Sequence, residues 1–573
     1  MWRLVLATLG LSNVLGAQFC IGRVSSLVSL HYTAPRSVAH GTRACRFGPK
    51  LGSKSRRAMR PALTAVASSE PSFDDLCTVP KDDTFNPVGF VREVIAAPVP
   101  PANCNRFDGL GKKTGGIWRS RVMGFLPSMV FTSPATDAWI AEQEATENIT
   151  PYYPESVVQL IGSSMRYSSD LSNKEHAAMM KIYDQALSPK STVALMPMMN
   201  EVLQKRVVRW RQCAESGQEV ALFEDIQVFT LETIARAMLR DYATDAIMSD
   251  ILRIAPVHFN GAFSIPCHFP WPLSRLPLFS FGRSMKAREE FVSIMKGMLD
   301  ERRKEMKSTT APGGSDKQRR NAGVLGSFLD LQANQRDANE PGEGKVEIDD
   351  DYIIANVFGM FLAGWKTNSS AISRMVQLLG SAEGKEISKQ LIEELRREIP
   401  ASDEETLEES STSRPSSSIL SRLPVTEATF LESIRLHPSV PAVFRKVKEE
   451  TSYNGYRIAA GEKIQWNSSH GWRSKSLYPD PTRFCPFRYL KRGSDGGYTL
   501  TKGKDAEQPL PRPFGFGLRL CRGRELAKME AFLFVRALMT NFDFKLVEGQ
   551  SFKGKMPANE PKDHVRVKLT PNV

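Results

Sequence analysis

One cysteine stands in a glycine- and arginine-rich stretch near the C-terminal end of the sequence. Residues 513–526 read PFGFGLRLCRGREL, with Cys521 just ahead of a helix-forming run. Glycines allow sharp turns, and the unpaired N–H groups and dipole at a helix start favour a thiolate over a thiol. A single thiolate without a nearby second Cys or His is a poor zinc site but suits an axial ligand of haem iron. The alternative interpretation is a buried structural cysteine in a glycine-rich turn.

A second candidate for chemistry lies in the middle of a long helical pattern over residues 349–379, whose acidic start suits the helix dipole. Residues 363–370 read AGWKTNSS. Here Gly364 allows a close backbone approach, and the hydroxyl of Thr367 is able to hydrogen-bond a ligand and relay protons. The alternative is a Gly/Ser/Thr patch where two helices cross.

The spacing around the cysteine is specific, because five positions within ten residues follow one pattern. They are Phe514, Gly517, Arg519, Cys521 and Gly523. This pattern resembles the haem-binding signature of the cytochrome P450 family, and residues 363–370 resemble its Ala/Gly-Gly-x-Asp/Glu-Thr-Thr/Ser segment. The resemblance implies a mainly α fold with a small β-region (α+β, the cytochrome P450 fold) and heme b, an iron protoporphyrin ligated by Cys521.

The same resemblance implies further cofactor contacts. Phe514 and Gly515 belong to the haem-binding loop, and Arg445 and Arg519 are expected to balance the haem propionates. Some branches of the family carry a His and, four residues later, an Arg at the start of a helix that contacts haem. This chain keeps the His as His176 but has Met180 and then Lys181 at the second position. A solvated helix face is the alternative for that segment.

Lys366 departs from the family pattern, which places an acid immediately before the threonine. An ammonium cannot replace a carboxylate as a proton relay at neutral pH without a large pKa change. Either protons arrive through water and Thr367, or the chemistry is not ordinary oxygen activation. Gly364, Lys366 and Thr367 are the predicted catalytic residues.

A buried charge network is expected to brace the cysteine region. Glu432 and Arg435 are three residues apart in a helical pattern over residues 426–437, so they share one face. They resemble the family's Glu-x-x-Arg motif, and Arg488, in the Pro-Phe-Arg-Tyr stretch 486–489, resembles its third member. We predict a Glu432–Arg435–Arg488 network in which every partner is needed.

The remaining elements are predicted from periodicity and turn signals. We expect successive amphipathic helices over residues 190–305, interrupted by a proline- and aromatic-rich connector at 259–281. A strand pair is expected around Pro127 within residues 122–131, and a two-strand hairpin over 456–464. Polar low-complexity loops are expected near residues 307–345 and 401–421.

Charge and cysteine use divide the chain into a leader and a folded body. The net charge is +13, but residues 1–69 hold ten Lys/Arg and no acid, which leaves 66 basic against 63 acidic residues for the rest. This distribution argues against a nucleic-acid partner. Eight scattered cysteines form neither a disulfide scaffold nor a zinc ribbon. We predict a signal-like segment 1–17, a transit-like segment 18–70 and a catalytic domain 71–573, in a plastid, with the endoplasmic reticulum membrane or mitochondrion as alternatives.

The resemblance implies a monooxygenase that inserts one oxygen atom from dioxygen into an apolar, isoprenoid substrate (a terpenoid, a sterol or a carotenoid-like molecule). We expect a monomer with peripheral membrane contact and an electron donor, either ferredoxin or a flavoprotein reductase. A basic surface near the cysteine would attract an acidic donor; its residues are Arg512, Arg522, Arg524 and Lys528. The alternatives are a haem-thiolate isomerase or dehydratase acting on lipid hydroperoxides, and a non-enzymatic haem sensor.

Overall fold

The computed structural model describes most of the chain after residue 116. The described ranges are 77–78, 117–122, 126–131, 136–153, 155–162, 174–261, 272–309, 323–337, 348–398, 422–467, 471–494, 496–501, 508–551, 554–555 and 558–572. The predicted leader, the low-complexity segment 401–421 and residues 262–271 of the predicted connector lie outside them. All described residues belong to residues 71–573. No helix among them is both long and apolar enough to cross a bilayer.

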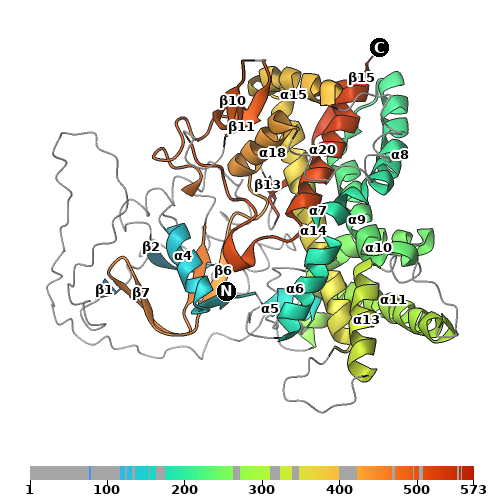
Figure 1. The fold of residues 1–573 in the computed structure, drawn as a ribbon, viewed down its shortest axis with the longest axis vertical. Coiled ribbons are helices and arrows are strands. Elements are labelled where there is room, and N and C mark those ends of the chain that lie inside the picture. Colours follow the sequence, from blue (N-terminus) through green and yellow to red (C-terminus); the bar gives the residue numbers. More distant parts are fainter. Residues whose placement is uncertain are drawn as a thin grey trace, which may run out of the picture. The chain divides into compact units, whose positions relative to one another are not determined.

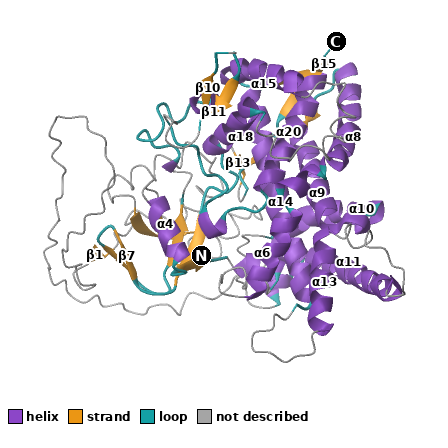
Figure 2. Ribbon diagram, viewed as in Figure 1, coloured by secondary structure: helices purple, strands orange, loops and turns teal. Residues whose placement is uncertain are grey.

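Helices dominate the described residues (Figure 2). They are α4 (Thr136–Ala145), α5 (Glu155–Ile161), α6 (Lys174–Ala186), α7 (Pro189–Val193), α8 (Met196–Glu215), α9 (Leu222–Leu239), α10 (Asp245–Phe259), α11 (Ser280–Thr309), α13 (Gly323–Asp337), α14 (Asp350–Leu379), α15 (Lys385–Glu398), α18 (Pro424–Leu436) and α20 (Arg524–Asn541). Apolar residues of α8 to α20 form one large buried cluster, as amphipathic helices require.

The strands form small sheets. They are β1 (Cys77–Thr78), β2 (Ile117–Val122), β3 (Leu126–Phe131), β4 (Ile149–Pro151), β5 (Val220–Ala221), β6 (Val443–Val447), β7 (Thr451–Tyr453), β8 (Tyr456–Ile458), β9 (Lys463–Trp466), β10 (Leu490–Arg492), β11 (Tyr498–Leu500), β12 (Phe542–Leu546), β13 (Gly554–Lys555), β14 (Glu560–Pro561) and β15 (Arg566–Pro571). The largest has the order β2-β3-β9-β6-β4 and a hydrophobic cluster of its own. The expected mainly α fold with a small β-region is therefore confirmed.

α14 is the helix around which the other helices pack. It contacts α9, α18 and α20 along its length (Figure 1). Asp349 caps its start, since its carboxylate accepts a hydrogen bond from the Tyr352 N–H at 2.6 Å. Most of the helix is buried, including Phe361, Trp365 and all residues from 368 to 379. The helix predicted over residues 349–379 is thus confirmed.

Two β-strand predictions and one loop prediction are wrong in detail. Pro127 lies inside β3 opposite Arg121, and residues 123–125 between the two strands lie outside the described set. Residues 456–464 do not form one hairpin: β8 pairs with β7 across an Asn454–Gly455 turn, whereas β9 pairs with β3 and β6. Both turn residues have positive φ, 52° and 78°, which Asn and Gly tolerate best.

Part of the predicted loop at 307–345 is helical. α13 occupies residues 323–337 and buries Val324, Leu325 and Phe328 completely. These side chains recur at helical spacing among polar neighbours, and their burial against α9 and α14 outweighs the polar composition of the segment. Residues 310–322 and 338–347 lie outside the described part of the chain.

A buried histidine between α5, α10 and α14 predicts a pH dependence of stability. His258 is completely buried, its Nε2 lies 3.2 Å from the Leu160 carbonyl, and its ring meets that of Phe358 at 4.1 Å. Burial lowers the pKa of His258 to about 3, while the Leu160 carbonyl raises it. The unfolded chain therefore binds a proton that the folded chain rejects, so stability falls as pH drops from about 6.5 toward about 3.

We expect His258→Gln to remove this loss. The free energy of unfolding of the wild type should fall by up to about 1.4 kcal/mol more per pH unit than that of the variant over this window. Urea unfolding at several pH values measures both slopes, and other titrating groups cancel in the comparison. An equal dependence of the free energy of unfolding on pH in the two proteins would contradict the role assigned to His258.

Candidate active site

The cysteine loop closes on itself through backbone hydrogen bonds. The Cys521 N–H donates to the Phe514 carbonyl at 2.9 Å, and the Gly515 N–H donates to that of Arg512 at 3.0 Å. Gly515 and Gly517 have φ values of +74° and +60°, where other L residues are strained. Phe514 stacks on Phe430 of α18 with 6.3 Å between ring centroids. The glycines therefore allow the loop to turn, and Phe514 fastens it to the helical core.

Cys521 is an exposed residue at the end of this loop, three residues before α20. Part of the side chain is accessible to solvent. The protein atoms packed around the sulfur nevertheless raise the pKa of its thiol, and the Gly523 N–H, Arg524 and Arg522 only partly oppose the rise. The Gly523 N–H at the helix start thus favours the thiolate as predicted, but burial has the larger effect and the net shift of the pKa is upward. A coordinating metal ion would favour the thiolate.

The middle of α14 opens on one face. Met360 and Thr367 are partly exposed and Ala363 is exposed, although the helix is buried on either side of this turn. The three residues are spaced by three and four, so they share one face. The Thr367 hydroxyl donates to the Ala363 carbonyl at 2.5 Å, and the Ser439 hydroxyl donates to the Thr367 carbonyl at 2.7 Å. The predicted hydroxyl is thus held on the accessible face.

α14 and α20 are joined close to both candidate groups. Asn368, next to Thr367, donates through its amide to the Ala527 carbonyl at 3.3 Å and to the Glu530 carboxylate. Both acceptors belong to α20, the helix that follows Cys521. Burial raises the pKa of Glu530 well above its usual value, against the effect of Asn368. This polar contact couples the cysteine region to the Thr367 turn.

Gly364 has a different role from the one predicted. A Cβ at this position would lie 2.9 Å from Cγ1 of Ile234 on α9, so the residue faces a helix crossing instead of a ligand. Thr230 of α9 and Ser369 of α14 also meet across this crossing, with 2.7 Å between their hydroxyl oxygens. The glycine permits close packing of the two helices, which was the alternative interpretation.

We therefore expect Gly364→Ala to destabilise the fold by about 1–3 kcal/mol through overpacking. Adding Ile234→Ala should restore part of the lost stability. The nearest remaining atom, the Cβ of residue 234, lies 3.4 Å from a Cβ at position 364. A double-mutant cycle on urea unfolding measures the coupling. Additive effects would show that the two side chains do not meet.

Lys366 is buried away from solvent in a charged and aromatic surrounding. Its Nζ lies 2.7 Å from the Glu560 carboxylate on β14, 4.2 Å from the Trp365 ring centroid and 5.3 Å from that of Phe259. The ammonium is thus engaged by an anion and by two aromatic faces. The sequence identified the position but not Glu560, because nothing local links residues 194 apart in the chain.

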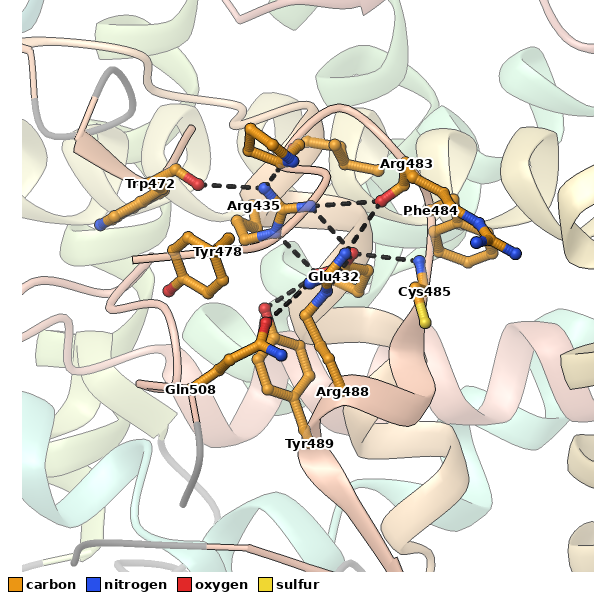
Figure 3. Close-up of polar contacts among 12 residues, drawn as sticks. Glu432, Arg435, Trp472, Tyr478, Arg483, Phe484, Cys485, Arg488, Tyr489 and Gln508 are labelled. Carbon is orange, nitrogen blue, oxygen red and sulfur yellow. Dashed lines mark hydrogen bonds and ion pairs between the residues drawn. The ribbon is translucent and has the colours of Figure 1, made fainter. Parts of the chain in front are cut away.

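The predicted charge network is confirmed. Glu432, completely buried, accepts hydrogen bonds from Arg435 at 2.7 and 2.9 Å and from Arg488 at 3.0 Å. Figure 3 shows Glu432 between the two guanidinium groups, with the Cys485 N–H and the Tyr489 hydroxyl directed to the same carboxylate. Arg435 also holds the carbonyls of residues 472, 481 and 483. The network therefore fixes the chain that leads toward the cysteine loop.

The predicted propionate contacts lie on separate elements. Arg445 of β6 is buried, and its Nε donates to Glu144 of α4 at 2.6 Å. Burial lowers the pKa of Arg519, Arg445 lowers it further, and Tyr153 and Glu144 oppose the shift. His176 of α6 is buried, whereas Lys181 is exposed. Arg445 is buried and Arg519 is half-buried, and two such interacting guanidinium groups suit an anionic ligand. Glu144, absent from the sequence-based prediction, neutralises part of their charge.

The basic residues beside the cysteine loop are largely paired with carboxylates of the chain itself. The ion pairs are Arg522–Asp184 at 3.0 Å, Arg524–Glu525 at 3.2 Å and Lys528–Glu427 at 2.7 Å. Arg512 is exposed, with its guanidinium 5.7 Å from the Phe516 ring. The attraction that this surface exerts on an acidic partner is therefore smaller than its basic residues alone predict.

These residues fit a flat, dianionic haem. Cys521 is exposed at the end of its loop, a Cβ added at Gly517 would meet no atom within 4 Å, and α14 presents an accessible face at Ala363 and Thr367. Cys521 would hold the iron, and Arg445 and Arg519 would balance the propionates. A thiolate-ligated haem iron supplies activation of dioxygen with O–O cleavage.

Comparison with known proteins agrees with this chemistry. The family model of cytochrome P450 matches residues 100–568. The chain is 25% identical over 457 residues to cytochrome P450 120 of Synechocystis sp., covering 79% of this chain and 89% of the relative. It is 23% identical over 446 residues to abscisic acid 8'-hydroxylase 1 of Arabidopsis thaliana, covering 77% and 81%.

The fold has solved counterparts as well. A structure titled "Retinoic acid bound cyanobacterial CYP120A1" superimposes with a TM-score of 0.66 at 21% identity, covering 87% of this chain and all of that one. The match of the family model extends over most of the sequence and includes the cysteine loop, the α14 turn and the charge network. The chain therefore belongs to the cytochrome P450 family of Cys-ligated haem b monooxygenases.

Proposed function

We propose that this monooxygenase inserts one oxygen atom from dioxygen into an isoprenoid substrate, with Cys521 as the iron ligand and Thr367 as the hydroxyl that handles protons. The observation that carries the proposal is the accessible turn of α14. Met360 and Ala363 give it an apolar surface, and Thr367 gives it one hydroxyl. Such a surface takes up an apolar substrate and leaves its orientation to few polar groups.

The relatives support the substrate class. One is named abscisic acid 8'-hydroxylase and another taxane 13-alpha-hydroxylase, the latter from Taxus cuspidata at 22% identity over 468 residues. The solved relative was obtained with retinoic acid. All three molecules are built from isoprene units and are largely apolar. We therefore infer an isoprenoid for this chain.

The test uses the haem-loaded protein with a surrogate ferredoxin and its reductase. We expect oxygen uptake that depends on abscisic acid, retinoic acid or a taxane, together with a product heavier by one oxygen atom. A saturated fatty acid serves as the non-isoprenoid control. Oxidation of the fatty acid alone would overturn the isoprenoid assignment, and turnover of a lipid hydroperoxide without reductant would favour an isomerase or dehydratase.

Ferredoxin as the natural donor and a plastid as the compartment are proposals that rest on the composition of residues 1–70, which are rich in Ser and Arg and hold one acid, Glu70. A fusion of these residues to a fluorescent protein tests the compartment. Import into plastids is the expected result. Accumulation in the endoplasmic reticulum or in mitochondria would point to the corresponding alternative, with a flavoprotein reductase as donor at the endoplasmic reticulum.

A further inference from the structure

An ion pair attaches the turn of α14 that carries Thr367 to β14, which pairs with β13 near the C-terminal end of the chain. Lys366 and Glu560 are 2.7 Å apart, and only 9% and 18% of their side chains are exposed. The Trp365 and Phe259 rings lie beside the ammonium. A charge in this position is stable only while its partner remains, because removing one member leaves the other buried and uncompensated.

The backbone beside Glu560 is held independently of that ion pair. The Asn559 carbonyl accepts hydrogen bonds from Ser370 at 3.0 Å and from Arg374 at 3.2 Å, both on α14. The Asn559 amide donates to the Pro438 carbonyl at 3.0 Å. Asn559 is completely buried and has a φ of +51°, which Asn tolerates better than most residues. Changing the Glu560 side chain should therefore leave β14 in place beside α14.

Without the Glu560 carboxylate, the Lys366 side chain has two possible positions. Its ammonium can stay buried beside the aromatic rings, or the long flexible side chain can place the ammonium in the nearest water. On the same helix turn, the accessible positions are Ala363 and Thr367. The solvent-facing position would bring the positive charge of Lys366 and its hydration water next to the Thr367 hydroxyl.

We propose that Glu560 is a positioning residue that holds the Lys366 ammonium away from the accessible face of α14 that carries Thr367, beside which the haem of this family would activate dioxygen. The proposal rests on the monooxygenase activity of the family and not on the identity of the substrate. The Glu560 carboxylate neutralises the Lys366 ammonium. The turn therefore tolerates a lysine at a position where the family pattern has an acid. Proton handling is then left to Thr367 and water.

The experiment compares Glu560→Gln, Lys366→Met and the double variant with the wild type, all as full-length haem-loaded proteins. Glu560→Asp, which keeps the charge, and Glu548→Gln, which changes an exposed carboxylate of the C-terminal segment, are the controls. The first readout is equilibrium binding of azide, an anion, and of imidazole, which is neutral, followed by their absorption changes. It requires neither substrate nor electron donor.

In Glu560→Gln we expect the ratio of azide to imidazole affinity to rise roughly tenfold, because an ammonium several ångströms from the bound anion attracts it through a medium of intermediate dielectric constant. The double variant should return to within about twofold of the wild type, since it has no ammonium to release. Both controls should keep the wild-type ratio. A general packing defect would weaken both ligands together.

The second readout is the share of electrons that ends as hydrogen peroxide during reduction by the surrogate ferredoxin. We expect this share to rise several-fold in Glu560→Gln and to return in the double variant. An unchanged affinity ratio in Glu560→Gln, or an equal rise in the double variant, would overturn the proposal. Failure to oxidise any isoprenoid would leave the affinity ratio intact and would count only against the proposed substrate.

Discussion

Cys521→Ser is expected to abolish the thiolate-type Soret band of the reduced, carbon-monoxide-bound protein and to reduce oxygen insertion by at least about a thousandfold, some 4 kcal/mol of transition-state stabilisation. The thiolate donates electron density that favours O–O cleavage, and a serine hydroxyl does not replace it. Haem content and the absorption spectrum are measured on the same sample, so that loss of cofactor and loss of the ligand type are separated.

Cys213→Ser and Cys485→Ser are the matched controls. Both residues are partly buried free cysteines, and the contact of Cys485 with Glu432 runs through its backbone N–H at 3.1 Å, which serine retains. Both variants should keep the thiolate-type band. If the band survived in Cys521→Ser, or vanished in one of the controls, the ligand would have to be reassigned.

Glu432→Ala is expected to have the largest effect on stability, about 3–5 kcal/mol, because it leaves two guanidinium groups buried without their carboxylate. Arg435 is completely buried and the side chain of Arg488 is 5% exposed. Tyr489 would also lose its acceptor at 2.8 Å. Urea unfolding measures the stability, and the ratio of haem to protein absorbance measures the incorporation of haem, which should fall in parallel.

The reason for the parallel loss lies in what the network holds. Arg488 donates to the Pro479 carbonyl at 3.1 Å and to the Gln508 side chain at 2.7 Å, and Gln508 precedes the cysteine loop. Glu427→Ala is the control, because Glu427 lies on α18 like Glu432 but forms a partly exposed ion pair with Lys528 of α20, so its loss should cost at most about 1 kcal/mol. Normal stability with full haem content in Glu432→Ala would contradict the role of the network.

The sequence by itself predicted the features that short-range spacing dictates. The helix over residues 349–379 follows from its acidic start and its apolar pattern. Glu432 and Arg435 share a helix face because they are three residues apart, and the glycines of the cysteine loop identify the turn that they permit. The family match agrees with the cofactor predicted from that loop. The individual site residues remain predictions for the variants above to test.

The tertiary structure decided which distant groups meet. Glu144 is 301 residues from Arg445, and Glu560 is 194 from Lys366, yet each pair is in contact. The crossing of α9 and α14 decided that Gly364 faces Ile234. Local propensity acts over a few residues, whereas burial brings together whichever side chains the packed helices leave adjacent, and a charge removed from water must then find its partner there. Lys366 could therefore be recognised as unusual from the sequence, but only the fold supplied Glu560.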